Sequence, residues 1–261
     1  MNSKKEQQKH QAARTAVDYI KEGMTIGLGS GTTSHYLIQE AGKKYAEGLH
    51  FYGIATSRES EQLAASLGIP LLQPEQTGKI HLAIDGVDEI DKDFRAVKGG
   101  GGALLREKII ASWAEEVIWI MDESKLVERL GTFPFPVEAV PFGMPFVKQK
   151  ITDMGAVPVL RMREDRPYLT DSGNYILDIK FFTGYRYIPC CRTDTQYAGS
   201  CGDRILWADV QPYCGRYRVW CESYGKPNLA DWKVRLKGCT EKPVKKGRPE
   251  DQTKKVYWKA I

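Results

Sequence analysis

Four loops of this chain carry the residue types that bind phosphate, bind sugar hydroxyls or move protons. Each loop follows an apolar run that fits a buried strand. In open α/β sheets, ligands bind outside the carboxyl ends of the strands, so the four loops are candidates for one ligand site. The loops are GLGSGTT (27–33), DGVDEID (85–91), KGGGG (98–102) and DESK (122–125).

The loop at residues 27–33 is suited to an anion. Its glycines allow a tight turn, the predicted helix behind it offers unpaired N–H groups, and the hydroxyls of Ser30, Thr32 and Thr33 add donors. A dinucleotide fingerprint would need its third glycine one residue later. Thr-Ser-Arg at 56–58 also stands where an NAD site usually has an acid, and its Arg would at best suit NADP. The glycine spacing disfavours an NADP-dependent dehydrogenase. A structural glycine turn is the other interpretation.

Residues 85–91 hold four acidic side chains in seven positions. These carboxylates could bind a divalent cation, but no His or Cys is spaced to join them and the twelve-residue calcium-loop pattern is absent. Two interpretations follow. The segment is either a solvated acidic turn or a set of carboxylates that bind sugar hydroxyls or move protons.

The glycine run at residues 99–102 costs backbone entropy in any fold, and a structural turn needs only one or two glycines. Four in succession indicate close approach of the backbone to a ligand. Glu107 follows in the first turns of the next predicted helix, where it either complements the helix dipole or acts on a ligand. Its neighbours Arg106 and Lys108 are expected to face solvent.

The last loop contains Lys125, which pairs either with an anion or with Glu123.

The elements that must position these loops alternate between helix and strand patterns. This βαβ order predicts a doubly wound, mostly parallel, Rossmann-like α/β sheet with helices on both faces, over residues 1–130. After Pro134 and Pro136 the order changes to strand, helix, strand, strand, which predicts part of a smaller α+β domain at residues 131–181. The expected strands are 24–29, 51–56, 80–85, 117–121, 137–140, 157–162 and 175–179, and the expected helices are 12–20, 32–45, 59–67, 103–113 and 146–154.

Charge is distributed unevenly along the 261 residues. Residues 1–180 contain 22 Lys and Arg against 25 Asp and Glu, a net charge of −3, whereas residues 181–261 contain 16 against 8, a net charge of +8. No run approaches the roughly 20 apolar residues of a membrane-spanning helix, and the polar first ten residues lack the apolar core of a secretory signal. A cytoplasmic protein without a membrane partner is expected.

In order, GLGSGTT, DGVDEID, KGGGGALLREK (98–108) and DESK, followed by PFPVEAVP (134–141), resemble the A type of ribose-5-phosphate isomerase. The resemblance extends from about residue 12 to residue 180, and KGGGGALLREK is its highly specific segment. It implies interconversion of ribose 5-phosphate and ribulose 5-phosphate in the non-oxidative pentose phosphate pathway. It also implies a homodimer or homotetramer with a sugar phosphate as partner, no nucleic acid, and neither a metal nor an organic cofactor.

The resemblance assigns roles to particular residues. Glu107 would remove a proton beside the carbonyl and return it to the neighbouring carbon through a cis-enediol, which requires a pKa raised by partial burial. Lys98 and the glycine-loop amides would stabilise the enediolate oxygen, and Asp85 with Asp88 would hold sugar hydroxyls and assist ring opening. The substrate-binding residues so implied are Ser30, Gly31, Thr32, Thr33, Asp85, Gly86, Val87, Asp88, Lys98, Gly99, Gly100, Gly101 and Lys125. The alternative is a non-catalytic sugar-phosphate-sensing module on a related fold, which would not need a base at Glu107.

Residues 182–261 depart from the family pattern. They show no sustained strand or helix period, and the six cysteines all lie there without a CxxC pair, so no zinc site is expected. The basic, aromatic-rich composition comes without a nucleic-acid recognition motif.

The genetic code offers an explanation for this tail. Permitted codons for Tyr197–Trp207, read from the second nucleotide, give Met-Pro-Gly-Val-Val-Glu-Thr-Gly-Phe-Phe-Gly, a segment that the family pattern has at about this position. We interpret residues from about 182 onward as an out-of-frame tail without a selected function. Apolar residues would then fall at random phase, so residues 182–261 are expected to lack well-packed regular structure.

Overall fold

The larger part of the molecule is built on a five-stranded parallel sheet. The structure is a computed structural model that describes residues 2–92, 95–180, 206–207, 211–212 and 217–220. The mostly parallel, doubly wound sheet predicted from the sequence is confirmed. Its strand order is β14-β6-β3-β1-β2, formed by Tyr217–Trp220, Ala114–Ile120, Ile80–Gly86, Thr25–Leu28 and Tyr52–Ala55.

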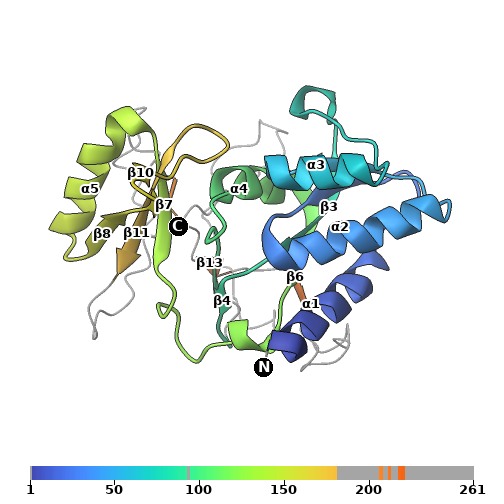
Figure 1. The fold of residues 1–261 in the computed structure, drawn as a ribbon, viewed down its shortest axis with the longest axis horizontal. Helices are drawn as coiled ribbons and strands as arrows, with labels where there is room; N and C mark the ends of the chain where they lie inside the picture. Colours follow the sequence, from blue (N-terminus) through green and yellow to red (C-terminus); the bar gives the residue numbers. More distant parts are fainter. Residues whose placement is uncertain (1, 93–94, 181–205, 208–210, 213–216, 221–261) are drawn as a thin grey trace, which may run out of the picture.

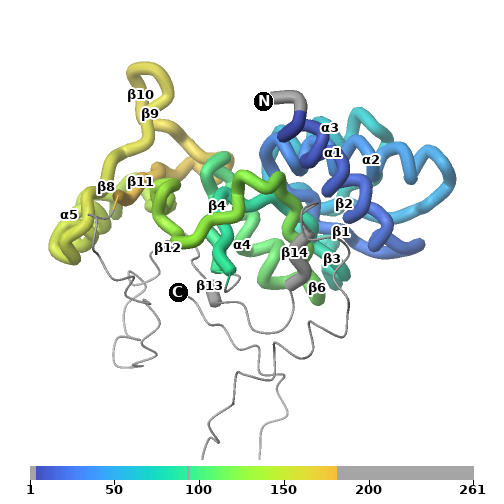
Figure 2. Tube along the Cα trace, turned by 90° about the horizontal axis from the view of Figure 1, so that it is seen from below, coloured from blue at the N-terminus to red at the C-terminus, as the bar shows by residue number. Residues whose placement is uncertain are grey.

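Helices cover both faces of this sheet (Figures 1 and 2). On one face lie α1 (Asn2–Val17), α2 (Gly31–Ala46) and α3 (Arg58–Ser66), and their apolar side chains form one core with alternate residues of β1, β3 and β6. On the other face, α4 (Leu104–Trp113) buries Ile110 against Ala83 and Val117. The two faces share strands but not side chains, because successive residues of a strand point to opposite sides.

Helix α1 begins at Asn2, about ten residues before the predicted start. The prediction followed the buried stripe of Ala12, Ala13, Ala16 and Val17 and so missed the polar first turns. Those turns are held by contacts on their exposed side, in which Lys9 donates to Glu6 at 2.8 Å and Tyr36 donates to Glu6 at 2.7 Å. A solvent-facing helical segment needs no apolar period of its own once its continuation is anchored.

A second, smaller domain is present as predicted, and Figure 1 shows it beside the larger one. Its antiparallel sheet has the order β12-β7-β11-β8 and is covered by α5 (Met144–Asp153), whose Val147 and Ile151 pack against strand residues. A short hairpin of β9 (Met162–Arg163) and β10 (Arg166–Pro167) follows β8. The four strands are Leu206–Trp207, Phe135–Ala139, Tyr175–Lys180 and Val157–Leu160.

The acidic segment is not a loop throughout. Residues Glu89–Ile90 form β4, which pairs with β5 (Arg95–Val97) in an antiparallel hairpin that the sequence prediction missed. Asp85, Glu89 and Asp91 are all buried, so the solvated-turn interpretation was wrong. Three single-turn helices, η1 (Pro74–Gln76), η2 (Glu123–Lys125) and η3 (Pro141–Gly143), complete the connections in this part of the chain.

Three short strands of the tail are described, and the expectation that residues 182–261 lack well-packed regular structure stays a prediction. β12 pairs with β7, β13 (Gln211–Pro212) pairs with β5, and β14 pairs in parallel with β6. A strand edge offers backbone donors and acceptors to any extended segment, so such pairing needs no apolar pattern. The rest of the tail, with its six cysteines, lies outside the described residues. Among the described helices, none is long and apolar enough to cross a membrane.

Candidate active site

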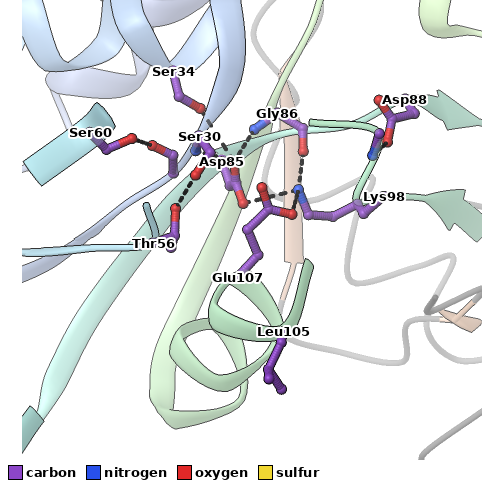
Figure 3. A network of polar contacts seen from close by, with 12 residues as sticks. Ser30, Ser34, Thr56, Ser60, Asp85, Gly86, Asp88, Lys98, Leu105 and Glu107 are labelled. Carbon is purple, nitrogen blue, oxygen red and sulfur yellow. Dashed lines mark hydrogen bonds and ion pairs between the residues drawn. The ribbon is translucent and has the colours of Figure 1, made fainter. Parts of the chain in front are cut away.

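Asp85 is the centre of a polar network at the carboxyl end of β3 (Figure 3). Its Oδ1 accepts hydrogen bonds from the backbone N–H of Gly86 at 2.7 Å, from that of Ser30 at 3.1 Å and from Ser34 Oγ at 3.3 Å. Two of these donors come from the start of α2. The parallel pairing of β1 with β3 therefore joins the first and second predicted loops at one carboxylate.

Lys98 connects Asp85 to Glu107. Its Nζ lies 3.0 Å from Asp85 Oδ2 and 3.4 Å from Glu107 Oε2, and it also donates to the carbonyl oxygen of Gly86. Lys98 directly follows β5, and Glu107 lies in the first turn of α4, so two separate elements meet at this amine. Figure 3 shows Lys98 reaching between the two carboxylates.

Glu107 is buried, with 5% of its surface exposed. Apart from the ion pair with Lys98, its Oε2 has no hydrogen-bond partner among the residues that the structure describes. A buried carboxylate oxygen without a partner is costly, and such a group is a candidate for a ligand contact. The alternative of an ordinary solvent-facing acid at a helix start does not fit this environment.

The environment of Glu107 favours its protonated form. Burial is the main cause and the nearby Asp85 carboxylate adds to it, while Lys98 opposes them, so the pKa of Glu107 rises to about 8. For Lys98, burial alone would lower the pKa, but the carboxylates of Asp85 and Glu107 outweigh it and raise the pKa above its ordinary value. The site thus holds a lysine that stays charged beside an acid poised near neutral pH.

The glycine run bends tightly around these groups. Gly99 and Gly102 have φ values of +94° and +90°, which side chains disfavour, and the N–H of Gly102 donates to Gly99 O at 3.0 Å. The N–H of Gly100 donates to Asp88 Oδ2 at 2.7 Å, and a Cβ on Gly100 would lie 2.6 Å from the same carboxylate. A Cβ on Gly101 would meet no described atom within 4 Å. Three glycines are therefore needed for the fold, and Gly101 borders open space.

The first loop presents its backbone at the start of α2. Ser30 Oγ lies 2.6 Å from Thr56 Oγ1, so this hydroxyl is already engaged, and Thr33 is buried. Gly31, with φ +83°, and Thr32 are exposed. Within this loop, the open positions are thus Gly31 and Thr32 at the first turn of a 16-residue helix.

Val87 and Lys125 of the predicted binding set have no described side-chain contact with the network. Val87 packs its side chain into the apolar core beneath α4, so any ligand contact would come from its backbone. Lys125 lies in η2, and no described contact links it to Asp85 or Lys98. Its neighbour Glu123 pairs with Lys4 at 2.6 Å.

The remaining acids of residues 85–91 have structural partners. Glu89 accepts from the N–H groups of Gly131 at 2.8 Å and Phe133 at 2.6 Å, and Asp91 pairs with Arg95 at 2.6 Å. In the described part of the chain, no three His, Cys, Asp or Glu side chains gather in a way that could hold a metal ion.

The smaller domain supplies contacts that the sequence prediction missed. Arg161 donates to Gly100 O at 2.8 Å, and Glu138 Oε2 accepts from the N–H of Leu105 at 3.2 Å. Arg106, expected to face solvent, instead donates to the backbone oxygen of Asp171 at 3.2 Å. These partners are separated from the glycine loop by more than 30 residues, so no local spacing pattern could reveal them.

Comparison with known proteins agrees with this geometry. A family model described as ribose 5-phosphate isomerase A (phosphoriboisomerase A) matches residues 52–189, more than half of the chain. The chain belongs to the ribose 5-phosphate isomerase A family. The match ends close to the residue where the sequence departs from the family pattern.

Individual family members are similar over most of their own length. The ribose-5-phosphate isomerase A of Bacillus mycoides (strain KBAB4) is 46% identical over 173 residues, which cover 66% of this chain and 78% of that relative. The ribose 5 phosphate isomerase A structure from Neisseria gonorrhoeae superposes with a TM-score of 0.69 at 33% identity, over 84% of this chain and 94% of that one. A D-ribose-5-phosphate isomerase solved in complex with phospho-erythronic acid gives a TM-score of 0.67 at 36% identity, over 71% and 82%.

Membership of the ribose 5-phosphate isomerase A family identifies the chain as an aldose–ketose isomerase of ribose 5-phosphate and ribulose 5-phosphate. The alternative of a non-catalytic sensing module is not supported, because the Bacillus and Neisseria relatives are both named as isomerases.

Proposed function

We propose that this chain isomerises ribose 5-phosphate with Glu107 as the group that carries the proton between the two carbons. The observation that carries the proposal is the burial of Glu107 next to a charged lysine, with its Oε2 3.4 Å from Lys98 Nζ. A carboxylate whose pKa lies near the working pH can both accept and return a proton, and the pKa of Glu107 is raised to about 8.

The proton transfers balance without a cofactor. Glu107 takes the proton from C2 of the open-chain aldose, and the C–H electron pair forms the C1–C2 double bond of a cis-enediolate. The carbonyl oxygen at C1 takes up the negative charge, and the proton of the C2 hydroxyl moves to it. Glu107 then returns its proton to C1 as the charge left on the C2 oxygen forms the C2 carbonyl, which yields the ketose. One carboxylate on one face of the enediol is enough for both steps.

The charge that develops on the enediolate oxygen needs a fixed positive partner. We assign this role to Lys98, together with the N–H of Gly101, which borders open space. Asp85 keeps Lys98 in position through its Oδ2 and is the candidate for assisting ring opening, with Asp88 as a second contact for sugar hydroxyls. The direct ion pairs of Lys98 with Asp85 and Glu107 support a concerted role for these three groups.

For the phosphate we propose the first turn of α2. Gly31 and Thr32 are exposed there, and the N-terminus of a helix stabilises an anion through its free N–H groups and its dipole. Lys125 is assigned as an additional cationic contact on the family resemblance. Support also comes from a related isomerase whose structure holds phospho-erythronic acid, a phosphorylated sugar acid.

The decisive experiment compares the 261-residue chain with its Glu107→Gln variant in an assay of ketose formation from ribose 5-phosphate, without added metal or nucleotide. Gln keeps the size of the side chain but cannot accept the proton, so turnover should fall by about 10²–10⁴-fold. Binding of phospho-erythronic acid, measured by calorimetry, should be retained. Glu47→Gln, at an exposed position beyond the end of α2, is the matched control. Turnover in Glu107→Gln close to that of the unaltered chain would reject the assignment.

The phosphate assignment has its own test. Unphosphorylated ribose should bind far more weakly than ribose 5-phosphate, and inorganic phosphate should compete with the substrate. A variant with Thr32→Val should weaken substrate binding while leaving the pH dependence of turnover in place, because Thr32 is not part of the Asp85 network. Equal binding of ribose and ribose 5-phosphate would rule out a phosphate site here.

We further propose a cytoplasmic location and a homodimer or homotetramer, as the family resemblance implies, and the domain boundary near residue 131. Sedimentation velocity of the full chain tests the assembly. A monomer at micromolar concentration would contradict it.

A further inference from the structure

Gly100 is held through both of its backbone polar groups. On one side, the N–H of Gly100 donates to Asp88, which belongs to the larger domain. On the other side, the carbonyl oxygen of Gly100 accepts from Arg161 Nη1 at 2.8 Å, and Arg161 belongs to the smaller domain. Within the glycine loop, Gly100 is thus hydrogen-bonded to both domains.

Arg161 is itself held rigidly. Its Nε and Nη2 donate to the two oxygens of Asp178 at 2.9 and 2.5 Å, which is the bidentate fork that only a guanidinium can form. Its backbone N–H donates to Ile176 O at 2.8 Å, and its carbonyl accepts from the N–H of Tyr168 at 2.9 Å. The guanidinium carbon also lies 6.0 Å from the centre of the Tyr168 ring. Both side chains of the pair are largely removed from solvent, with 16% and 22% of their surface exposed.

The direction of one N–H group follows from this arrangement. A trans peptide is planar, so its C=O and N–H point in opposite directions. When Arg161 holds the carbonyl of Gly100, the N–H of Gly101 must point away from Arg161. In the described part of the chain this N–H has no hydrogen-bond acceptor, and the space beside Gly101 is open. A substrate oxygen is the acceptor that the reaction would supply.

We propose that Arg161, held by Asp178, is a positioning residue that aims the Gly101 N–H at the enediolate oxygen. This inference rests on the proposed function, because it needs an enediolate in the site. It extends that function by giving the smaller domain a part in the reaction: the domain orders the loop on which charge is stabilised. Donors that are ordered before the reaction stabilise a transition state more strongly than donors that must reorient.

The test uses the full chain with Arg161→Met, which keeps the aliphatic stem and removes every donor. We expect kcat to fall by about tenfold to a hundredfold, the effect typical of losing one charged hydrogen bond and displacing a reacting group. KM should change much less, since the phosphate contacts lie elsewhere. The pH at which kcat/KM rises should stay in place, because Arg161 has no described contact with Glu107. Amide hydrogen exchange of Gly101 and Gly102, followed by NMR, should become faster.

Two further variants separate positioning from general damage. Arg161→Lys keeps one charge but cannot form the fork, so its kcat should lie between those of the unaltered chain and Arg161→Met. Arg163→Met, two residues further along the chain in exposed β9, should leave kcat and exchange unchanged. If Arg161→Met does not fold, Asp178→Asn replaces it, with the same loss of kcat and faster exchange expected to a smaller degree.

Unchanged kcat and unchanged exchange in Arg161→Met overturn the inference, and so does an equal loss of kcat in Arg163→Met. Failure of the proposed function looks different. In that case Glu107→Gln turns over as fast as the unaltered chain, and the exchange of Gly101 alone then decides whether Arg161 orders the loop.

Discussion

Removing the positive charge of Lys98 should shift the pH dependence of the reaction in a direction fixed by the structure. The pH profile of kcat/KM reports the ionisation of the free enzyme. With the pKa of Glu107 at about 8, about one tenth of the molecules hold the base form at pH 7. For the unaltered chain, kcat/KM should therefore rise about tenfold per pH unit below pH 8 and level off above about pH 9.

The Lys98→Met variant removes a cation 3.4 Å from Glu107 Oε2. At an effective dielectric constant of about 20, a unit charge at this separation stabilises the carboxylate by about 5 kcal/mol. Since one pKa unit corresponds to about 1.4 kcal/mol, the rise of kcat/KM should move upward by about three and a half pH units. The value of kcat/KM in the variant should still be increasing tenfold per pH unit at about pH 10. Its value should be much lower than in the unaltered chain at every pH, because the enediolate has also lost its cation.

The assay is ketose formation from ribose 5-phosphate in buffers of constant ionic strength between about pH 6 and pH 10. Lys92→Met, an exposed lysine beside the same acidic segment, is the control and should keep the profile of the unaltered chain. A plateau in Lys98→Met that begins at the same pH as in the unaltered chain would refute the reasoning. So would a rise of kcat/KM that is complete below pH 6 in the unaltered chain, because Glu107 would then be an ordinary exposed carboxyl.

Two further predictions concern the scaffold. In Gly29→Ala the new Cβ would lie 2.6 Å from the Asp85 Cα. This overpacking should lower the free energy of unfolding by about 1–3 kcal/mol, measured with denaturant, and should also lower kcat. Gly78→Ala, where the new Cβ meets open space, should change neither quantity. Glu138→Ala leaves the N–H of Leu105 and the Thr170 hydroxyl without their shared acceptor. We expect the free energy of unfolding of this variant to fall by about 1–3 kcal/mol. A melting temperature equal to that of the unaltered chain would show that these contacts do not stabilise the fold.

The spacing of apolar residues and the positions of glycine and polar boundaries were sufficient to predict most of the helices and strands. Strands β1, β3 and β6 and helices α2 and α4 lie within a few residues of their predicted ranges, because each combines an apolar run with a glycine or polar boundary. Residues Glu89–Ile90 and Arg95–Val97 were missed. Their pairing depends on each other and on buried acids that bind backbone N–H groups, which is not a local property.

The sequence by itself determined that the loops at residues 27–33 and 85–91 lie at one edge of the sheet, and which residue types they carry. Parallel strands share the direction of their carboxyl ends, so Ser30, Asp85 and the acidic segment had to meet near one edge once the βαβ order was known. The long, specific segment at residues 98–108 was likewise sufficient to indicate the family without any knowledge of distances.

Only the tertiary structure decided the chemistry of Glu107. Its raised pKa comes from burial and from carboxylates more than 15 residues away along the chain, and Lys98 sets how far the shift goes. The contacts of Arg161 and Glu138 with the glycine loop and α4 were equally hidden, because they join two domains. Local sequence encodes the period and the breaks of an element, whereas electrostatic energy depends on distances in space, and those exist only after the chain has folded.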